Sequence, residues 1–515
     1  MFDHLGQLPA AAAQRYGDKL ALVSGEKALS FNEINHLVEC VASGLSDLGI
    51  VQGDIITLYA ANSWEWVVSY YAIARLGGVI NPVSTMLRPN EIEYVVRDCG
   101  SKAIIASQEK IDAILGVKKV SDVDIIICFG GDNKNKDVIS LDSLITAKIN
   151  TSPMPKIDPG SLASITYTSG TTGHPKGAML SHRAIILNTA MTSQMHMRGV
   201  DDIVVSALPC PHVYANVLMN GMLMCGTNLI LHSKFDAAAI LNDISKYEAT
   251  IFDGVPTMYM YMLNCPQLNE ADLSSLTRCY VGGQTMPIAA MKEVESAFKV
   301  PLIELWGMTE IAGLGATHAL LGTNKHGSIG CALPYCEVRI AEAEDASRTL
   351  AYGEVGELMI RGPIVMMGYY GDRQKTHETI EADGWLHTGD LATMDQDGCV
   401  RIVDRKKDMI LTGGYNVYPA EIERVLAEHP AVAIAAVGKL PDDLKGEIAK
   451  AYIVLKNDAK CTEEEIIAFC RNVLAAYKCP RKVQFVNDVP KTSTGKIMRR
   501  ELHTLETNLL DTKND

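Results

Sequence analysis

Short runs of aliphatic and β-branched residues recur through the first half of the chain, with helical periodicity between them. The runs are three to six residues long and occupy 55–59, 103–106, 124–128, 203–208, 228–231 and 250–252. Strands buried on both faces form continuous apolar runs of this kind, because neither face meets water. Their alternation with helical segments predicts an α/β fold built on parallel strands.

Capping residues and apolar spacing indicate where several helices begin. Leucine and valine recur at helical spacing between residues 37 and 48, on one face of an expected helix. Asn62 or Ser63 is suited to cap the helix that follows it. A capping box at Thr462 predicts a helix that continues to Ala476.

The chain has 515 residues, which is too long for one hydrophobic core, so two or more domains are expected. The β/α rhythm resumes after a Pro-containing linker at 151–155 and changes near Gly330 to short strands and glycine-rich turns. The final segment, after residue 404, reads as a separate unit. The predicted fold is therefore a large region of two α/β sheets, a small β-rich part, and a small α+β unit at the C-terminal end.

Composition excludes several classes of protein. The net charge of −14 disfavours a nucleic-acid partner, because a phosphate backbone requires a basic surface. The 13 cysteines are scattered without C-x-x-C spacing, so neither a zinc site nor a disulfide framework is expected. No signal-peptide pattern is visible at the start, and the most apolar stretch, 215–231, contains three asparagines and is typical of buried core rather than of a membrane span. These features predict a cytoplasmic protein.

The segment 167–177 combines hydroxyls, glycines and a lysine at a density that ordinary turns do not require. Glycine lets backbone N–H groups approach an anion, hydroxyls add donors, and Lys176 adds a positive charge. The spacing differs from that of a P-loop, since Pro175 stands five residues after Gly170. The segment predicts a site for a polyphosphate, with a flexible surface loop as the alternative.

Further glycine-rich or charged segments follow in a fixed order. They are V-G-G-Q-T-M-P (281–287), E-L-W-G-M-T-E (304–310), H-T-G-D (387–390), V-D-R-K-K-D (403–408), T-G-G-Y-N (412–416) and P-K-T-S-T-G-K (490–496). Together with 167–177 they resemble the adenylate-forming superfamily, which includes acyl-CoA synthetases, the adenylation domains of peptide synthetases, and firefly luciferase. The resemblance runs from about residue 10 to residue 502.

This resemblance implies binding of ATP. The residues expected to contact the nucleotide are Thr168, Ser169, Gly170, Thr171, Thr172, Lys176, Gly283, Gln284, Thr285, Glu304, Trp306, Gly307, Asp390 and Arg405. Asp390 would accept the two ribose hydroxyls, since a carboxylate offers two acceptor oxygens. Trp306 stands where members of the superfamily often have tyrosine against the base, and a flat ring suits stacking. A core tryptophan is the alternative for Trp306.

The resemblance also implies residues for catalysis and for a metal. Thr309 would contact the α-phosphate, and Glu310 would hold Mg²⁺, which prefers hard oxygen ligands. Lys496 would reach the substrate carboxylate in the first half-reaction, in which the acid reacts with ATP to form an acyl-adenylate. His212 lies in a Pro-x-x-His segment that often gates the acid pocket, with a core histidine as the alternative.

Two half-reactions at one acyl carbon imply two domains that change their relative orientation. The resemblance implies an AMP-binding domain over 1–404 and a mobile C-terminal domain over 405–515. The hinge would be Lys407, where many members of the superfamily have Asp. After rotation, Gly413 and Gly414 would face the channel for CoA.

The sequence specifies the carboxylic acid substrate less clearly than it specifies the nucleotide. Its pocket is expected around 212–216, 253–257, 281–285 and 307–315, where glycines and alanines of the last segment would leave room for a chain or ring. Asp253 is the one candidate that could meet an amino group. An apolar carboxylic acid is therefore favoured, a medium- or long-chain fatty acid above an aromatic acid.

The predicted activity is that of an acid–CoA ligase that uses ATP, Mg²⁺ and CoA, with a homodimer as one possible assembly. CoA is favoured over a carrier protein, because the chain has no carrier motif and no insertion between Gly389 and Lys407. The alternatives are an aryl- or hydroxycinnamate–CoA ligase, an acyl-AMP ligase that loads a carrier protein, and a non-catalytic binder. Eight basic residues against one acid in 471–500 predict a surface for a polyanion or a solvated face.

Overall fold

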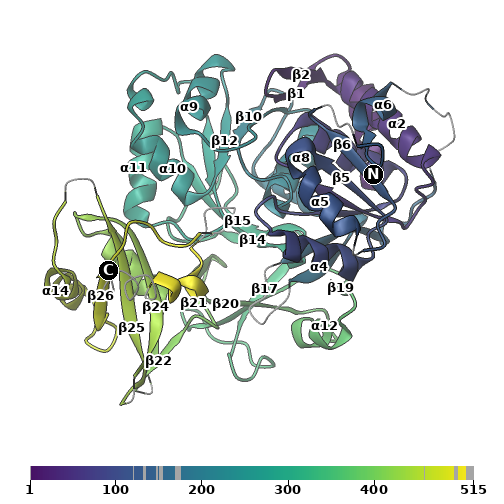
Figure 1. The fold of residues 1–515 in the computed structure, drawn as a ribbon. Helices are drawn as coiled ribbons and strands as arrows, with labels where there is room; N and C mark the ends of the chain where they lie inside the picture. The colour runs from purple at the N-terminus through teal and green to yellow at the C-terminus, as the bar shows by residue number, and fades with distance from the viewer. Residues whose placement is uncertain are drawn as a thin grey trace, which may run out of the picture.

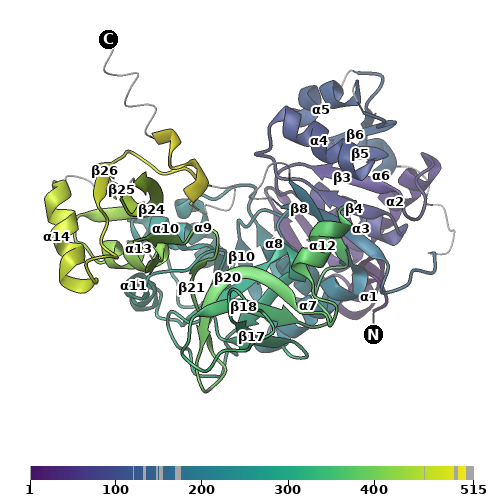
Figure 2. The same cartoon turned by 90° about the horizontal axis from the view of Figure 1, so that it is seen from below.

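The computed structural model describes residues 2–119, 121–131, 135–146, 149, 155–168, 175–413, 415–442, 444–456, 459–491 and 497–505. Four β-sheets organise these residues, with helices packed on the two largest (Figure 1). Figure 2 shows the small four-stranded sheet, in green, between the N-terminal half and the C-terminal end of the chain. The prediction of an α/β fold with a β-rich part and an α+β C-terminal unit is confirmed.

The first large sheet has eight strands in the order β19-β9-β8-β4-β3-β5-β6-β7. Its strands are β3 (Ile55–Tyr59), β4 (Val79–Pro82), β5 (Ala103–Ser107), β6 (Ile125–Phe129), β7 (Ile139–Ser140), β8 (Leu162–Thr168), β9 (Lys176–Ser181) and β19 (Gly368–Tyr369). The three predicted apolar runs in this sheet form β3, β5 and β6, which pair in parallel. β9 pairs antiparallel with both β8 and β19.

The second large sheet has nine strands in the order β16-β15-β14-β13-β12-β10-β11-β1-β2. Its strands are β1 (Leu20–Ser24), β2 (Lys27–Ser30), β10 (Ile203–Ser206), β11 (Asn228–Leu231), β12 (Ile251–Gly254), β13 (Arg278–Val281), β14 (Leu302–Met308), β15 (Gly313–Thr317) and β16 (Cys331–Ala332). β10 ends two residues earlier than predicted, because the hydroxyl of Ser206 accepts the N–H of Leu208 at 3.2 Å and turns the chain.

Two smaller sheets complete the fold. The four-stranded antiparallel sheet contains β17 (Glu337–Ala341), β18 (Gly356–Arg361), β20 (Leu386–Met394) and β21 (Val400–Arg405). The five-stranded sheet contains β22 (Ile410–Thr412), β23 (Tyr415–Val417), β24 (Val432–Asp442), β25 (Gly446–Leu455) and β26 (Lys482–Phe485). We refer to the described residues from 410 to 505 as the C-terminal unit.

Helices connect and cover these sheets. The α-helices are α1 (Leu8–Tyr16), α2 (Phe31–Asp47), α3 (Trp64–Arg75), α4 (Pro89–Cys99), α5 (Ile111–Lys118), α6 (Leu141–Ile145), α7 (His182–Met195), α8 (Val213–Cys225), α9 (Ala237–Lys246), α10 (Pro256–Leu263), α11 (Ile288–Phe298), α12 (Arg373–Thr379), α13 (Pro419–Ala427) and α14 (Glu463–Val473). Short 3-10 helices are η1 (Leu5–Gln7), η2 (Gln108–Lys110), η3 (Pro266–Asn269), η4 (Thr309–Ile311) and η5 (Arg499–Glu501).

The predicted helix starts are largely confirmed. Ser63, rather than Asn62, caps α3 by accepting the N–H of Trp66 at 3.2 Å. The capping box at Thr462 is present at the start of α14. That helix ends at Val473 and not at Ala476, because Leu474 adopts an extended conformation.

The side chain of Asn62 has a different role, since it joins three loops across the protein interior. Its amide oxygen accepts the N–H of Cys210 at 2.7 Å, and its amide nitrogen donates to the carbonyls of Leu208 and His232, both at 2.9 Å. Asn62 is buried, so water cannot replace these bonds. The bonds fix the loop after β10 against the start of α3.

The two large sheets and the four-stranded sheet share one hydrophobic core, whereas the C-terminal unit has cores of its own. The boundary between domains at 404/405 stays a prediction. Every cysteine is a free thiol. Among the described residues, the helices are all too short or too polar to cross a lipid bilayer.

We expect Asn62→Ala to lower the free energy of unfolding by about 2–4 kcal/mol, because three buried polar groups lose their partner. Urea titration followed by circular dichroism measures the change. Asn264→Ala is the matched control, because the Asn264 side chain is exposed and makes one bond, to the Met260 carbonyl. Equal destabilisation by the two substitutions would contradict this account.

Candidate active site

Asp390 lies where the nine-stranded and four-stranded sheets meet. The indole N–H of Trp306, on β14, donates to Asp390 Oδ2 at 2.8 Å. Arg405 on β21 lies directly opposite Asp390 on β20, and its Nε is 2.6 Å from Asp390 Oδ1. Each oxygen of the carboxylate therefore has one partner. Three residues that the sequence predicts around a nucleotide are brought into direct contact.

Glu310 in η4 is buried beside the first large sheet. The hydroxyl of Tyr369, on β19, donates to Glu310 Oε1 at 2.8 Å. The ammonium of Lys176, at the start of β9, lies 5.8 Å from the centre of the Tyr369 ring. Burial raises the pKa of the Glu310 carboxyl, and the hydrogen bond from Tyr369 opposes that shift, as does the charge of Arg405. Tyr369 thus contacts both the predicted metal ligand, Glu310, and the predicted phosphate-binding lysine, Lys176.

Tyr369 itself was not predicted to belong to the site. It lies in the segment M-M-G-Y-Y-G-D (366–372), which has no recognised motif. Its proximity to the site arises because β19 pairs with β9 across the sheet edge. A tyrosine after a glycine was the only available signal, and it is a weak one.

The predicted phosphate-binding segment is described only at its two ends. Thr168 closes β8 and Lys176 opens β9, and the two residues are partners in the antiparallel ladder. The Thr168 hydroxyl donates to the Lys176 carbonyl at 3.4 Å. Ser169, Gly170, Thr171 and Thr172 lie outside the described residues, as do Gly414 and Lys496.

The strip after β13 follows a strand that pairs with β14, where Glu304 carries a buried carboxyl group. Gly283 has φ +88°, a conformation that favours glycine, and with Gln284 and Thr285 it follows the carboxyl end of β13. Glu304 on the adjacent strand is only 2 % exposed, and its Oε2 has no hydrogen-bond partner among the described residues. Burial raises the pKa of Glu304 to about 7.

Three glycines predicted to leave room for the acid instead allow close packing. A Cβ at Gly307 would lie 2.0 Å from the carbonyl oxygen of Gly313, and a Cβ at Gly315 would lie 2.4 Å from a ring carbon of Trp306. A Cβ at Gly313 would lie 2.5 Å from Asn188 Oδ1. The missing side chains let β14, β15 and α7 approach one another, so that prediction is wrong at these positions.

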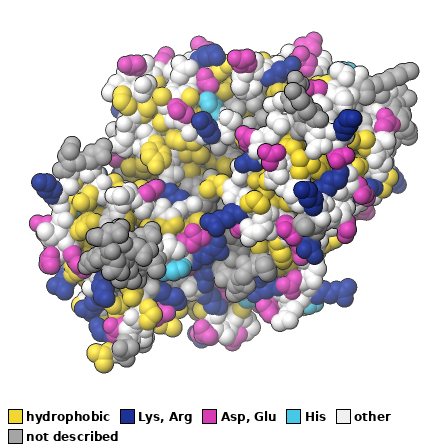
Figure 3. All heavy atoms as spheres, in the orientation of Figure 1, with side chains coloured by type: hydrophobic (Ala, Val, Ile, Leu, Met, Phe, Trp, Pro, Cys, Tyr) yellow, Lys and Arg dark blue, Asp and Glu magenta, His cyan; other side chains and the backbone are white. Residues whose placement is uncertain are grey.

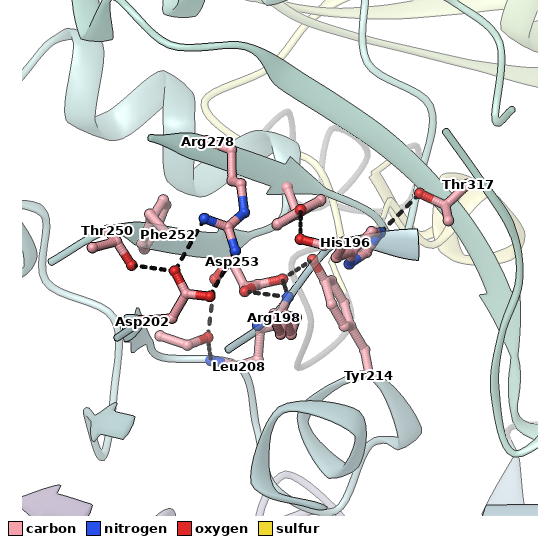
Figure 4. Close-up of polar contacts among 12 residues, drawn as sticks. His196, Arg198, Asp202, Leu208, Tyr214, Thr250, Phe252, Asp253, Arg278 and Thr317 are labelled. Carbon is pink, nitrogen blue, oxygen red and sulfur yellow. Dashed lines mark hydrogen bonds and ion pairs between the residues drawn. The ribbon is translucent and has the colours of Figure 1, made fainter. Parts of the chain in front are cut away.

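Asp253, the candidate partner for an amino group, is already paired (Figure 4). Nη2 of Arg198 donates to both carboxylate oxygens, at 3.0 and 2.9 Å, and the Tyr214 hydroxyl donates to Oδ1 at 3.0 Å. The side chains of Arg198 and Asp253 are 2 % and 0 % exposed. Breaking such a pair leaves an uncompensated charge in the interior. Asp253 is therefore not available to an ammonium group of an acid.

Aromatic and polar side chains extend this buried network, as Figure 4 shows. The ring of His196 stacks on Tyr280 with centroids 3.8 Å apart. Its Nε2 lies 3.0 Å from the Thr317 hydroxyl, a contact drawn in Figure 4. Arg278 forms a second ion pair with Asp202 at 2.7 Å. Burial lowers the pKa of His196, so this imidazole is neutral at pH 7. The charged side chains of this buried network are paired with one another, so Asp202 and Asp253 are both compensated by an arginine.

His212 precedes α8 as its N-cap residue. Burial lowers the pKa of His212 to about 4, so the imidazole is uncharged at neutral pH. Its backbone carbonyl accepts the N–H of Asn216, whose own side chain donates to the Cys210 carbonyl at 2.7 Å. The gating role of His212 stays a prediction.

The predicted hinge and channel residues follow β21. Lys407 is exposed in a turn in which the N–H of Lys406 donates to the Gly389 carbonyl at 2.9 Å. Gly413 has φ +57°, and a Cβ at this position would meet nothing within 4 Å. Backbone conformation, rather than lack of space, therefore requires glycine at this position.

Because its carboxyl group has a raised pKa, Glu304 destabilises the folded state once it ionises. Unfolded, the group titrates near 4.5, so stability falls as pH rises from there to about 7 and stays lower above it. We expect Glu304→Gln to gain about 3 kcal/mol relative to the unmodified chain between pH 4.5 and pH 8, as an order of magnitude. Urea titrations across this range test it. Exposed Glu344→Gln is the control, and parallel pH profiles for Glu304→Gln and the unmodified chain would contradict the assignment.

Known proteins resemble this chain along nearly its whole length. The family model "AMP-binding enzyme" matches residues 9–370, and the model "AMP-binding enzyme C-terminal domain" matches 421–496. A long-chain-fatty-acid–CoA ligase of Bacillus subtilis is 35% identical over 96% of this chain and 93% of its own length. One of Salmonella typhimurium is 34% identical over 99% and 96%.

Solved structures give the same result. The anthranilate CoA ligase AuaEII, in complex with anthranoyl-AMP, superposes with a TM-score of 0.92 at 27% identity, over 99% of this chain and 98% of that one. ATP-bound MatB from Rhodopseudomonas palustris superposes with a TM-score of 0.91 at 29% identity, over 98% and 99%. The chain therefore belongs to the AMP-binding enzyme family, in the acyl-CoA synthetase branch of the adenylate-forming superfamily.

Proposed function

We propose that this AMP-forming acid–CoA ligase activates an apolar, medium- or long-chain aliphatic acid. In the first half-reaction the acid carboxylate attacks the α-phosphorus of ATP, forming acyl-AMP as pyrophosphate leaves. In the second, the CoA thiolate attacks the acyl carbon and AMP leaves. A free carboxylate is a poor electrophile, and the adenylate converts its oxygen into a good leaving group. The protein's part is alignment and charge neutralisation.

The contact of Trp306 and Arg405 with Asp390 is the observation that carries the nucleotide site. Asp390 is held by one bond on each oxygen, and each oxygen has a second lone pair for a ribose hydroxyl. Trp306 presents a ring whose edge is anchored by that bond, which suits stacking of a base. The neighbouring Gly283, Gln284 and Thr285 complete the proposed adenosine site.

Glu310 fits the proposed Mg²⁺ site. Its carboxylate is a hard oxygen ligand, and the Tyr369 hydroxyl orients Oε1 without adding charge. When bound, Mg²⁺ would offset the repulsion between the acid carboxylate and the triphosphate. Thr309 adjoins Glu310 in η4, where its hydroxyl is proposed to donate to the α-phosphate. Lys176 and Lys496 are proposed to add positive charge.

The pairing of Asp253 supports an acid without an amino group. Arg198 and Tyr214 already satisfy its carboxylate, so the region beneath the strand ends offers no uncompensated negative charge from Asp253. Relatives named long-chain-fatty-acid–CoA ligase, at 33–35% identity, support an aliphatic acid. An aryl acid is the alternative, on the likeness to the anthranilate CoA ligase at 27%.

The proposal also covers the acyl acceptor, the rotation of the C-terminal domain and the cellular location. CoA rather than a carrier protein accepts the acyl group. The C-terminal domain, from 405 to 515, turns about Lys407 so that Gly413 and Gly414 line the CoA channel. The enzyme acts in the cytoplasm on small molecules, without a nucleic-acid partner, and a homodimer is its proposed assembly.

An acid panel with ATP, Mg²⁺ and CoA tests the substrate. We expect medium- and long-chain fatty acids to give acyl-CoA by mass spectrometry together with pyrophosphate release. Amino acids should give neither product, because the charge of Asp253 is already compensated by Arg198 and cannot bind an ammonium group. A faster reaction with benzoate- or cinnamate-type acids would replace the aliphatic assignment with the aryl one. Product formed only with a holo carrier protein would replace CoA as acceptor.

Substitution of Lys496 tests the two half-reactions separately. We expect Lys496→Ala to slow acyl-AMP formation by roughly 10²–10³-fold, because one charged contact to the reacting groups is lost. CoA transfer from supplied acyl-AMP should be spared. ATP–pyrophosphate exchange and thioester formation measure the two steps, and exposed Lys482→Ala is the control. Equal loss in both half-reactions would contradict the two-orientation scheme.

A further inference from the structure

Arg499, in η5, binds carboxylates from three separate segments. Its Nη1 lies 2.6 Å from Asp404 Oδ1 and 3.2 Å from Asp408 Oδ2. Its Nη2 and Nε lie 2.6 Å and 3.0 Å from the two oxygens of Glu423, on α13. The guanidinium side chain is 18 % exposed. One cation therefore links β21, the turn after it, and the C-terminal unit.

Asp404 is the most buried member of this cluster, with 1 % of its side chain exposed. Besides the bond from Arg499, its Oδ2 accepts the N–H of Ala420 at 2.7 Å, and its Oδ1 accepts the N–H of Arg405 at 2.7 Å. Ala420 lies in the first turn of α13, where backbone N–H groups have no partner within the helix. Asp404 thus holds both α13 and η5.

These bonds do not all lie on the same side of the proposed hinge. Asp404 pairs with Leu391 of β20 in the four-stranded sheet. Glu423 and Arg499 belong to the C-terminal unit, whose cores are separate from the core beneath that sheet. The bonds from Arg499 and Ala420 to Asp404 therefore cross the hinge segment, whereas the Arg499–Glu423 bonds lie within one unit. Figure 1 shows η5, in yellow, beside β24.

We propose that Asp404 and Arg499 are positioning residues for the first half-reaction, because their ion pair holds the C-terminal unit against β21 and parts when that unit turns for the second. This inference rests on the proposed function. In sequence, Arg499 follows Lys496 by three residues, and Asp404 precedes Arg405, which binds Asp390 at 2.6 Å. The pair therefore joins the segment after the proposed catalytic lysine to the strand that carries the proposed ribose site.

Release of this pair leaves Arg499 with partners. Its bonds to Glu423 stay within the C-terminal unit, so the guanidinium keeps a carboxylate after rotation. Asp404 loses Arg499 and Ala420 but keeps the N–H of Arg405. Because each charged group keeps one partner after release, neither is left wholly uncompensated when the C-terminal unit turns. Figure 3 draws the molecule in the orientation of Figure 1, and Lys and Arg side chains, in dark blue, gather near the middle of the face shown.

Asp404→Asn tests the proposal in the full-length enzyme. We expect ATP–pyrophosphate exchange, with an acid that the unmodified chain accepts, to slow about tenfold or more, as for loss of a charge-assisted bond. CoA transfer from supplied acyl-AMP should change little, so the ratio of the two rates falls. Arg499→Gln should lower the same ratio, and Arg499→Lys, which keeps the charge, should restore part of it.

Glu423→Gln is the matched control. It removes a carboxylate partner of the same guanidinium without crossing the hinge, so we expect the ratio of the two rates to stay that of the unmodified chain. Equal slowing of both half-reactions by Asp404→Asn, or a larger effect on CoA transfer, would overturn the proposal. If Asp404→Asn fails to fold, the two Arg499 variants decide. If the unmodified chain makes acyl-CoA but the variants leave the ratio of ATP–pyrophosphate exchange to CoA transfer unchanged, this inference alone is wrong. If the unmodified chain is inactive, the proposed function is wrong.

Discussion

The carboxylate of Asp390 joins parts of the enzyme that belong to different sheets. It takes the indole N–H of Trp306 from the nine-stranded sheet and the guanidinium of Arg405 from its own four-stranded sheet. The buried bond from Trp306 ties the two sheets together at this point, and the bond from Arg405 fixes the same carboxylate within its own sheet. A nucleotide bound at Asp390 would lie against the rigid side of the molecule. The C-terminal unit begins a few residues after Arg405 and is proposed to turn relative to this part of the molecule.

Buried carboxyl groups around the site differ in how fully they are paired. Asp253 has an arginine on both oxygens, so its charge is compensated and it serves packing. Glu310 has a tyrosine hydroxyl on one oxygen, which orients the group that is proposed to hold Mg²⁺. Glu304 has an oxygen without a partner among the described residues, and burial raises its pKa accordingly. The degree of pairing thus sets how each carboxyl group responds to burial.

Much of the fold was predictable because its signals are local. Buried parallel strands require β-branched apolar runs, and the runs at 55–59, 103–106 and 228–231 form strands as expected. Predictions about space were less successful. Glycine at 307, 313 or 315 looks the same in sequence whether it opens a pocket or lets two strands meet, and here it does the second. Tyr369 was missed, since only the pairing of β19 with β9 brings it to Glu310.

Motifs along the chain were enough to identify the superfamily and the nucleotide chemistry, because glycines, hydroxyls and charges that bind phosphate and ribose cluster within short segments. The partners of the buried charged side chains around the site were decided only by the folded chain. Asp253 and Arg198 are 55 residues apart, Trp306 and Asp390 are 84 apart, and Asp404 and Arg499 are 95 apart. No local pattern encodes such pairs, because they form only after sheets and helices have packed and excluded water from between them.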